Sequence, residues 1–352
     1  MALQASGPIS FSQISNEFGT PPGKNLGAYR ISQTIGELTR PLDDGIPISG
    51  PIQFGNFYSK RLNIVVYCSG NRVVARDLYN ANQSTYVIGG FTSRPGSSSG
   101  KKVWIYTNET IGSNIPASWS PNNLYCSLIT GGFDADTDLR LDIGPGGFVS
   151  GAGGDGGNGG NGGCVANFAG GLNGNFGTSA IGVNYQPIII TNRGNIWGGS
   201  GGGGGGSGSY GENRRSRRRD VRCYAAGGGG GGGNGIPGGS GGGAGGGTSG
   251  LRAGINANAS PGGAGGATFQ GGGGGGANVS GTGASAVGGA GGSGGATGGT
   301  SSAFGFDGSC AQGGGSPGAN GYGIVIANDG SGVSISGNAR IGGESPPNTP
   351  II

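Results

Sequence analysis

The sequence predicts an all-β protein combined with polyglycine II. An N-terminal docking segment and a small β-sandwich precede a glycine-rich lattice of polyglycine helices capped by short strands. Glycine accounts for 95 of the 352 residues, against a usual share of about 7%. It is also unevenly distributed, because residues 144–323 hold 74 of these glycines. We therefore divide the chain into an attachment segment at 1–60, a β domain at 61–143, the glycine-rich domain at 144–323, and closing strands with a tail at 324–352.

The segment 1–60 contains an imperfect repeat of the pattern Gly-Pro-Ile-x-Phe. Its copies are GPISFSQI at 7–14 and GPIQFGNF at 50–57. Gly-Pro favours an extended or turn conformation, alternating Ile and Phe are typical of a short strand, and the polar residues that follow can open a helical turn. Because such short elements bury little surface alone, we expect them to dock onto another chain or onto the next domain. The residues predicted to dock are Ile9, Phe11, Ile14, Ile52, Phe54 and Phe57.

The β domain at 61–143 contains runs rich in β-branched and aromatic residues, separated by clusters of Gly, Asn, Pro and Ser. This pattern predicts short strands, and six of them within about 80 residues favour a small sandwich. The predicted strands are 62–67, 72–76, 85–88, 102–106, 125–129 and 139–143.

A second recurring unit consists of an apolar strand, a tight turn and another short strand. It occurs at 139–151, 188–198 and 333–342. The first two copies lead directly into a glycine run, so strands are expected at the ends of the glycine-rich runs.

The glycine runs have two interpretations. A flexible linker is one, since Gly/Ser chains behave as coils and ordered glycine is entropically costly. The other is a lattice of polyglycine II helices, which have three residues per turn and bond sideways because they lack internal hydrogen bonds. The repeated return to apolar strands favours the lattice, and the lack of a three-residue glycine period excludes collagen. The runs lie at about 151–163, 198–209, 227–247, 262–277, 281–300 and 313–321.

Composition excludes several kinds of chemistry. The chain has no His, which excludes a Ser-His-Asp triad, a Cys-His pair and an imidazole metal ligand. The acidic stretch 134–138 has neither the Gly nor the Glu that a calcium loop requires, and GSSSGKK at 96–102 is one residue too short for a phosphate loop. We therefore expect no catalytic residues, no metal and no cofactor. No apolar run is long enough to predict a transmembrane helix.

The five cysteines form no C-x-x-C pair, which argues against a zinc site. We interpret them mainly as reduced, small apolar residues, with one or two disulfides as the alternative.

A cluster of arginines lies between two glycine runs and is the main candidate for binding. Guanidinium groups grip phosphate or carboxylate bidentately, so an anionic surface partner such as a phosphorylated glycan is one interpretation. A solvated loop or a contact with a neighbouring subunit is another, and nucleic acid is disfavoured because the rest of the chain lacks a basic face. The residues are Arg214, Arg215, Arg217, Arg218, Arg219 and Arg222, followed by Tyr224.

Aromatic residues lie beside polar ones in the segments between glycine runs. Rings that stack and amides that bond hydroxyls suit sugar or protein recognition, whereas the alternative is that each ring shields an end of the lattice. The candidates are Phe168, Phe176, Phe269, Phe304 and Phe306.

Two parts of the chain resemble proteins of tailed phages. GPISFSQISNEFG, followed by GPIQFGNFYSK, resembles the start of virion structural proteins, particularly those of contractile-tailed cyanobacterial phages. IIITNRGNIWGGSGGGGGG with its glycine-rich continuation resembles the glycine-rich adhesins at tail-fibre tips. That resemblance implies stacked polyglycine helices that display loops to host receptors.

From these observations we expect a non-enzymatic virion component, synthesised in the bacterial host cytoplasm and present in several copies. Its expected role is a tail-fibre or tail-tip adhesin that binds other tail or fibre proteins and a host cell-surface glycan or outer-membrane protein. The alternative is a purely structural baseplate, neck or capsid-surface protein whose lattice is a stiff spacer.

Overall fold

The computed structural model describes most of the N-terminal half of the chain and parts of the rest. The described residues are 2–21, 23, 25–35, 38–81, 97–113, 125–161, 170–184, 187–206, 209–213, 221–225, 227–243, 245, 285–287, 302–304, 310–311, 315–326, 333–336 and 341–342. The predicted strand at 85–88 and the predicted glycine runs at 262–277 and 281–300 lie outside them, apart from residues 285–287.

The N-terminal part consists of short elements. They are α1 (Phe11–Phe18), the 3-10 helix η2 (Leu26–Tyr29), the antiparallel pair β1 (Ser32–Ile35) and β2 (Leu38–Pro41), and the 3-10 helix η3 (Phe54–Phe57).

Both copies of the Gly-Pro-Ile-x-Phe repeat form a helical turn that begins at the Phe, instead of the predicted strand. In the first copy Ser10 caps α1: its backbone N–H donates to Gln13 Oε1 at 2.8 Å, and the Gln13 N–H donates to Ser10 Oγ at 3.2 Å. In the second, the Gln53 N–H donates to Asn56 Oδ1 at 2.7 Å. The residue before Phe is therefore a helix cap in each copy, and this reciprocal side-chain bonding outweighs the β propensity of Ile and Phe.

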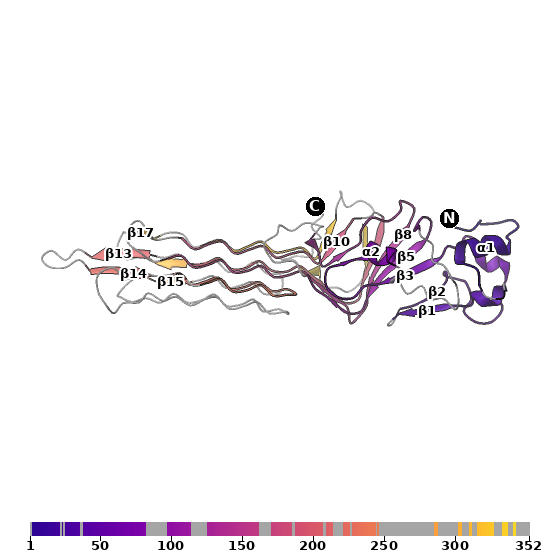
Figure 1. Ribbon diagram of the computed structural model, residues 1–352, viewed down its shortest axis with the longest axis horizontal. Coiled ribbons are helices and arrows are strands. Elements are labelled where there is room, and N and C mark those ends of the chain that lie inside the picture. The colour runs from indigo at the N-terminus through magenta and orange to yellow at the C-terminus, as the bar shows by residue number, and fades with distance from the viewer. Residues whose placement is uncertain are drawn as a thin grey trace.

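The central part is a parallel β-solenoid with three faces (Figure 1). Successive turns of the chain add strands to the three faces in the same order, and every pair within these sheets is parallel. The first face contains β3 (Asn63–Tyr67), β5 (Lys102–Thr107), β8 (Asp138–Ile143), β11 (Ile188–Asn192) and β19 (Val333–Ser336). The second contains β6 (Thr110–Ile111), β9 (Phe148–Ser150), β12 (Asn195–Trp197) and β20 (Ile341–Gly342). The third contains β4 (Val73–Val74), β7 (Leu128–Ile129), β10 (Ile181–Val183) and β18 (Ile324–Ile326), with α2 (Ala75–Asn80) after β4.

The predicted all-β fold with a small sandwich is wrong. A sandwich of this kind needs antiparallel sheets, whereas these three sheets are parallel and accompanied by a few short helices, an arrangement closer to α/β proteins. The strands also come from residues 63 to 342, so the β domain is not confined to 61–143. The reason is that each recurring strand–turn–strand unit stacks on the previous unit instead of pairing with its own neighbour along the chain.

Register explains the core of the solenoid. On the first face, inward residues stack in columns from strand to strand. One column contains Ile64, Val103, Leu139 and Ile188, and another contains Val66, Ile105, Leu141 and Ile190. All eight side chains are buried. Because strand residues alternate between faces, a shift by one residue would turn each column outward.

The N-terminal part closes one end of the solenoid. Ile14, Phe18, Tyr29 and Phe57 are fully buried and belong to the same core cluster as the solenoid strands. The Phe18 and Phe57 rings meet edge to face at 5.7 Å, and each also contacts Tyr29. The segment therefore docks onto its own chain.

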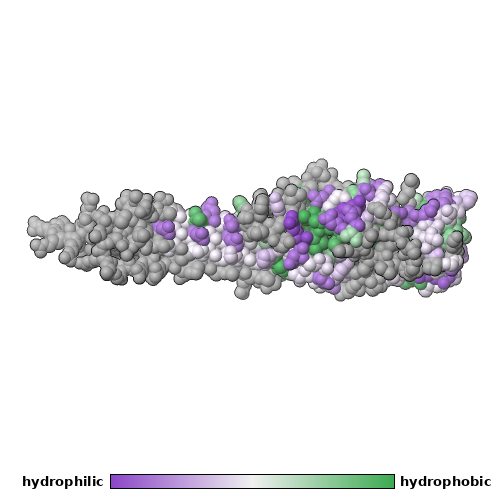
Figure 2. Space-filling view, viewed as in Figure 1, coloured by the Kyte–Doolittle hydropathy of each residue, from purple (hydrophilic) through white to green (hydrophobic). Residues whose placement is uncertain are grey.

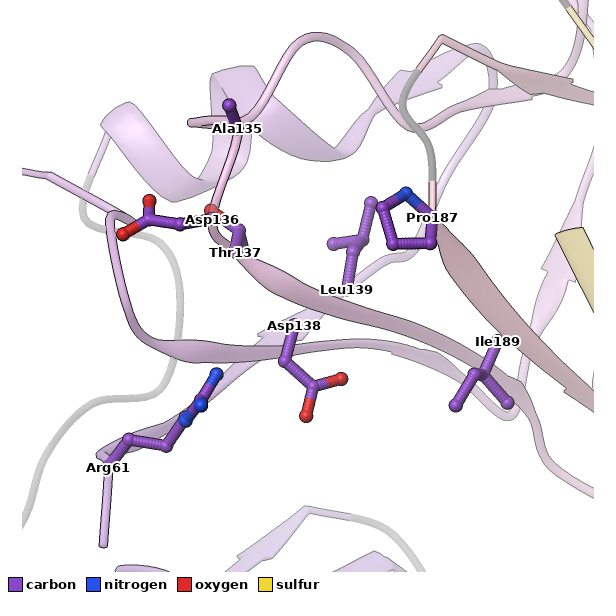
Figure 3. Close-up of a pocket in the computed structure, with 8 residues that line it drawn as sticks. All are labelled: Arg61, Ala135, Asp136, Thr137, Asp138, Leu139, Pro187 and Ile189. Atoms are coloured by element: carbon purple, nitrogen blue, oxygen red, sulfur yellow. The ribbon is translucent and has the colours of Figure 1, made fainter. Parts of the chain in front are cut away.

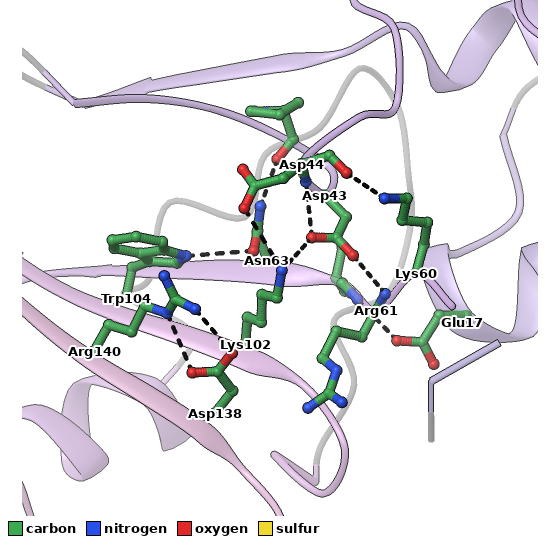
Figure 4. A network of polar contacts seen from close by, with 12 residues as sticks. Glu17, Asp43, Asp44, Lys60, Arg61, Asn63, Lys102, Trp104, Asp138 and Arg140 are labelled. Carbon is green, nitrogen blue, oxygen red and sulfur yellow. Dashed lines mark hydrogen bonds and ion pairs between the residues drawn. The ribbon is translucent and has the colours of Figure 1, made fainter. Parts of the chain in front are cut away.

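Charged groups also join these two parts (Figure 4). Glu17 on α1 is buried, accepts from the Leu62 N–H at 2.8 Å, and pairs with Lys101 Nζ at 2.6 Å. Asp43 accepts from the Arg61 N–H at 2.8 Å and from Lys102 Nζ at 2.6 Å. These contacts attach the N-terminal segment to the first strands of the solenoid.

Six described glycine runs lie side by side and extend away from the solenoid. We call them run A (residues 151–161), run B (170–178), run C (198–206), run D (227–235), run E (239–245) and run F (315–321). Runs A, C and E point in one direction and runs B, D and F in the other, as the order of their hydrogen bonds shows. Run B falls between the predicted runs, and the predicted run 227–247 is two antiparallel runs joined by a turn at Ile236 and Pro237.

Backbone hydrogen bonds between the runs recur every third residue. Gly154, Gly157 and Gly160 of run A donate to run C at 2.8 Å. Residues 153, 156 and 159 of the same run donate to residues 237, 240 and 243, in and just before run E, at 2.9–3.0 Å. A repeat of three residues with bonds only between chains is the geometry of a threefold extended helix. The runs therefore form a hydrogen-bonded lattice.

Glycine occupies the positions that face another run. A Cβ at Gly153 or Gly154 would overlap a carbonyl oxygen of run D or run B, respectively. The third position of run A holds Ala152, Asp155, Asn158 and Asn161, so this run reads Gly-Gly-x; Ala152, next to the solenoid, is buried, whereas Asn158 and Asn161 are exposed. Run B has one facing position per turn, at residues 171, 174 and 177. Glycine thus does hold a local three-residue period, contrary to our interpretation of the whole sequence.

Small strand pairs lie toward the far end of the lattice (Figure 1). β13 (Ser209–Asn213) pairs antiparallel with both β14 (Val221–Ala225) and β17 (Cys310–Ala311). β15 (Ser285–Val287) pairs antiparallel with β16 (Ser302–Phe304).

The lattice predicts an unusual response to alanine. Gly202→Ala is expected to lower the free energy of unfolding by about 1–3 kcal/mol, because its Cβ would overlap the carbonyl oxygen of Asp155. Asn175→Ala, on the exposed side of adjacent run B, is expected to be nearly neutral. Denaturant unfolding of the two variants checks this, and equal stabilities would contradict the lattice.

The contact between Glu17 and Lys101 predicts a second stability effect. Both side chains are less than 10% exposed, so Glu17→Gln leaves a buried ammonium unpaired and is expected to cost about 3–5 kcal/mol. The double variant with Lys101→Met is expected to recover part of this loss. Denaturant unfolding of the two variants measures the recovery, and a double variant no more stable than Glu17→Gln would refute the pairing.

Candidate functional site

The β13–β14 hairpin is the part of the described chain nearest the arginine cluster. Run C leads into β13, and the register places Tyr210 opposite Tyr224 and Glu212 opposite Arg222. The hairpin lies at the end of the lattice away from the solenoid (Figure 1).

The structure describes only some of the predicted receptor-binding residues. Arg222 and Tyr224 lie on β14 and Phe304 lies on β16, all toward the far end of the lattice, whereas Phe176 lies on run B at the side of it. Outside the described residues lie Arg214, Arg215, Arg217, Arg218, Arg219, Phe168, Phe269 and Phe306.

The residues predicted to dock onto a particle divide by burial. Ile14 and Phe57, the last residues of the two repeat copies, are fully buried in this chain's own core and are not available to a partner. Ile9, Phe11 and Ile52 are partly buried against that core. Phe54 is 41% exposed, so it is the member of the set most available for an external contact.

A shallow pocket of about 290 Å³ lies on the first face of the solenoid, near the start of β8 and β11 (Figure 3). Leu139, Pro187 and Ile189 supply its apolar side. Its charged side includes Asp138, which binds Arg140 at 3.1 Å, and Asp136, which accepts from Ser99 Oγ at 2.8 Å. Both acids already have partners, and the remaining charged residue of the lining is Arg61.

The acidic stretch 134–138 is held by hydroxyl groups. Asp134 accepts from Ser98 Oγ at 2.8 Å and from Ser97 Oγ at 2.9 Å, and these bonds hold the pKa of Asp134 below its usual value. Across the described ranges, no group of three or more His, Cys, Asp or Glu side chains is placed to hold a metal ion. The described helices are also all too short or too polar to cross a lipid bilayer.

Sequence reasoning proposed Phe176 as a candidate but missed Leu172 and Asn173, and it did not place this segment on the exposed side of a lattice run. Leu172 is 59% exposed and Phe176 is 44% exposed, with the exposed amides of Asn173 and Asn175 between them. The sequence did contain a signal for this surface. Glycine occurs at every third residue, at 171, 174 and 177, and this spacing marks the segment as a lattice run with two outward positions per turn.

Comparisons with known proteins bring no further information. No protein-family model, curated protein or solved structure is significantly similar to this chain.

The described thiols predict a labelling pattern. Cys68 and Cys126 are buried, and burial raises the pKa of each thiol to about 12. Since the thiolate is the reactive form, both are expected to resist iodoacetamide in the native protein and to react after denaturation. Mass spectrometry of the labelled peptides checks this, and native labelling of either residue would contradict its burial.

Proposed function

We propose that this chain is a non-enzymatic virion component of a tailed phage, a tail-fibre or tail-tip adhesin that presents loops to a host-surface receptor. One observation carries the proposal. The hairpin that brackets the arginine cluster lies at the opposite end of the lattice from the N-terminal segment (Figure 1).

The lattice suits a display role. Each of the six runs is hydrogen-bonded to at least two others, and run A alone, at 11 residues, spans about 34 Å. An arm bonded along its length loses little conformational entropy when its end binds a partner. The hairpin is thus held away from the N-terminal segment.

The arginine cluster suits an anionic receptor. Guanidinium groups cannot enter a lattice whose facing positions admit only glycine, so they belong in solvent or against an anionic partner. Phosphate or carboxylate groups on a host glycan or outer-membrane protein match this chemistry. The N-terminal end, where Phe54 is exposed, would then contact other tail or fibre proteins.

Replacing Arg214, Arg215, Arg217, Arg218 and Arg219 with Ser tests the role of the cluster. The labelled full chain is expected to bind cells of a susceptible strain within a panel of bacteria that includes cyanobacteria. The variant is expected to lose most of this binding at low salt, and the difference is expected to shrink at high salt because salt screens exposed charges.

Arg30→Ser, near the N-terminal end, is the control and is expected to bind as the unaltered chain does. Flow cytometry measures the binding. If the variant with five arginines replaced binds every strain as the unaltered chain does, the receptor role of the cluster is rejected. Incorporation into particles without any binding to cells would favour the structural spacer.

A further inference from the structure

We propose that the exposed side of run B is a binding surface for an uncharged oligosaccharide. This inference rests on the proposed adhesin function and adds a second contact, along the side of the arm, to the hairpin at its end. The surface, which we call the run B ridge, consists of Leu172, Asn173, Asn175 and Phe176.

The lattice does not account for the two apolar side chains of the ridge. Contact with run C requires glycine only at residues 171, 174 and 177, where a Cβ would overlap carbonyl oxygens. Thr178 is buried and accepts from the Ala152 N–H, and Asn173 bonds run F, but the side chains at the exposed positions 172, 175 and 176 make no such bond. Leu172 and Phe176 are nevertheless large and apolar and remain 59% and 44% exposed, so their identity is not explained by folding.

The ridge and its neighbour are uncharged. Run B, with the sequence GGLNGNFGT, and adjacent run F, with GSPGANG, contain no ionisable side chain. The nearest carboxylate of run A, that of Asp155, accepts from the N–H and the hydroxyl of Ser240 at 2.7 and 2.6 Å. Figure 2 shows isolated apolar residues among polar ones on the visible described surface of the arm. An uncharged surface of this kind favours a neutral ligand.

The polar groups of the ridge match hydroxyls. Asn173 accepts from the Ser316 N–H at 2.8 Å through Oδ1, which fixes the amide and leaves its NH₂ group to donate outward. Asn175 is exposed one turn from Leu172 on the same side of the run. The half-exposed Phe176 ring offers a flat apolar face on which the CH groups of a sugar can stack. Alternating amides and apolar groups are the chemistry that recognises neutral sugars.

The size of the ridge favours an oligosaccharide over a protein. It is one chain wide and, from residue 172 to residue 176, about 16 Å long, so it is far smaller than the roughly 800 Å² per partner that a stable protein interface buries. Its positions repeat every three residues, or about 9 Å, so a linear oligosaccharide along the arm meets equivalent positions at each turn. Because hydrogen bonds to runs A, C and F hold the backbone of run B, little ordering is needed on binding.

Isothermal titration calorimetry tests the inference. The full chain is titrated with linear gluco-, manno- and galacto-oligosaccharides. The unaltered chain is expected to bind at least one of them, with an affinity that salt does not change. Phe176→Ala and Phe176→Leu are expected to weaken binding about tenfold, whereas Phe176→Trp retains it because the ring is kept. The matched control is Phe54→Ala, which makes the same substitution at a similarly exposed Phe near the other end of the molecule. This variant is expected to bind the oligosaccharide normally.

The inference is overturned if the unaltered chain binds none of these sugars, or if Phe176→Ala binds a sugar as tightly as the unaltered chain does. It is also overturned if sedimentation shows that the chain self-associates and that Phe176→Ala abolishes this association. That last result would assign the ridge to contact with a second copy of the chain. The test is separate from that of the adhesin role. The variant with five arginines replaced by Ser is expected to bind the oligosaccharide normally, so failure at the hairpin and failure at the ridge are distinguishable.

Discussion

The structure depends on one constraint, the close approach of backbones that must satisfy their hydrogen bonds with one another. In the lattice, N–H groups donate to neighbouring runs at 2.7–3.0 Å every third residue, and this distance leaves no room for a Cβ between the chains. Glycine is therefore compulsory wherever a run faces a run. The remaining positions include buried polar side chains that bond the backbone, such as Thr178 and Ser200, and exposed residues that are free to bind something.

The share of glycine in a run accordingly reflects its place in the lattice. Run C is buried throughout and consists of glycine apart from Ser200, whereas run A follows Gly-Gly-x and run B needs one glycine per turn. Side chains complete the bonding where a backbone partner is lacking. Asn158 Oδ1 accepts from the Gly243 N–H at 2.7 Å, for example. The residues between the glycines thus either satisfy the edges of the arm or form its surface.

The solenoid supplies the register that the lattice needs. Run A continues β9 and run C continues β12, strands that already pair in parallel, and the Gly151 N–H donates to the Trp197 carbonyl at 2.9 Å across the junction. Runs B and F lead into β10 and β18, which also pair in parallel. A polyglycine chain alone has no side chains to specify its neighbours. The apolar columns of the solenoid and the N-terminal cap that closes it align the runs at their base.

The sequence by itself determined the glycine-rich domain, the strands at 102–106 and 139–143, and the repetition of the strand–turn–strand unit. These features follow from composition and from local apolar patterns. Only the tertiary structure decided that the repeated units stack in parallel, that Ile14 and Phe57 belong to the core, and that run B joins the lattice with one face exposed. The physical reason is that local propensity says which residues form strands, whereas parallel pairing joins residues far apart in the chain, such as Ile188 with Leu139, and no local signal specifies such a partner.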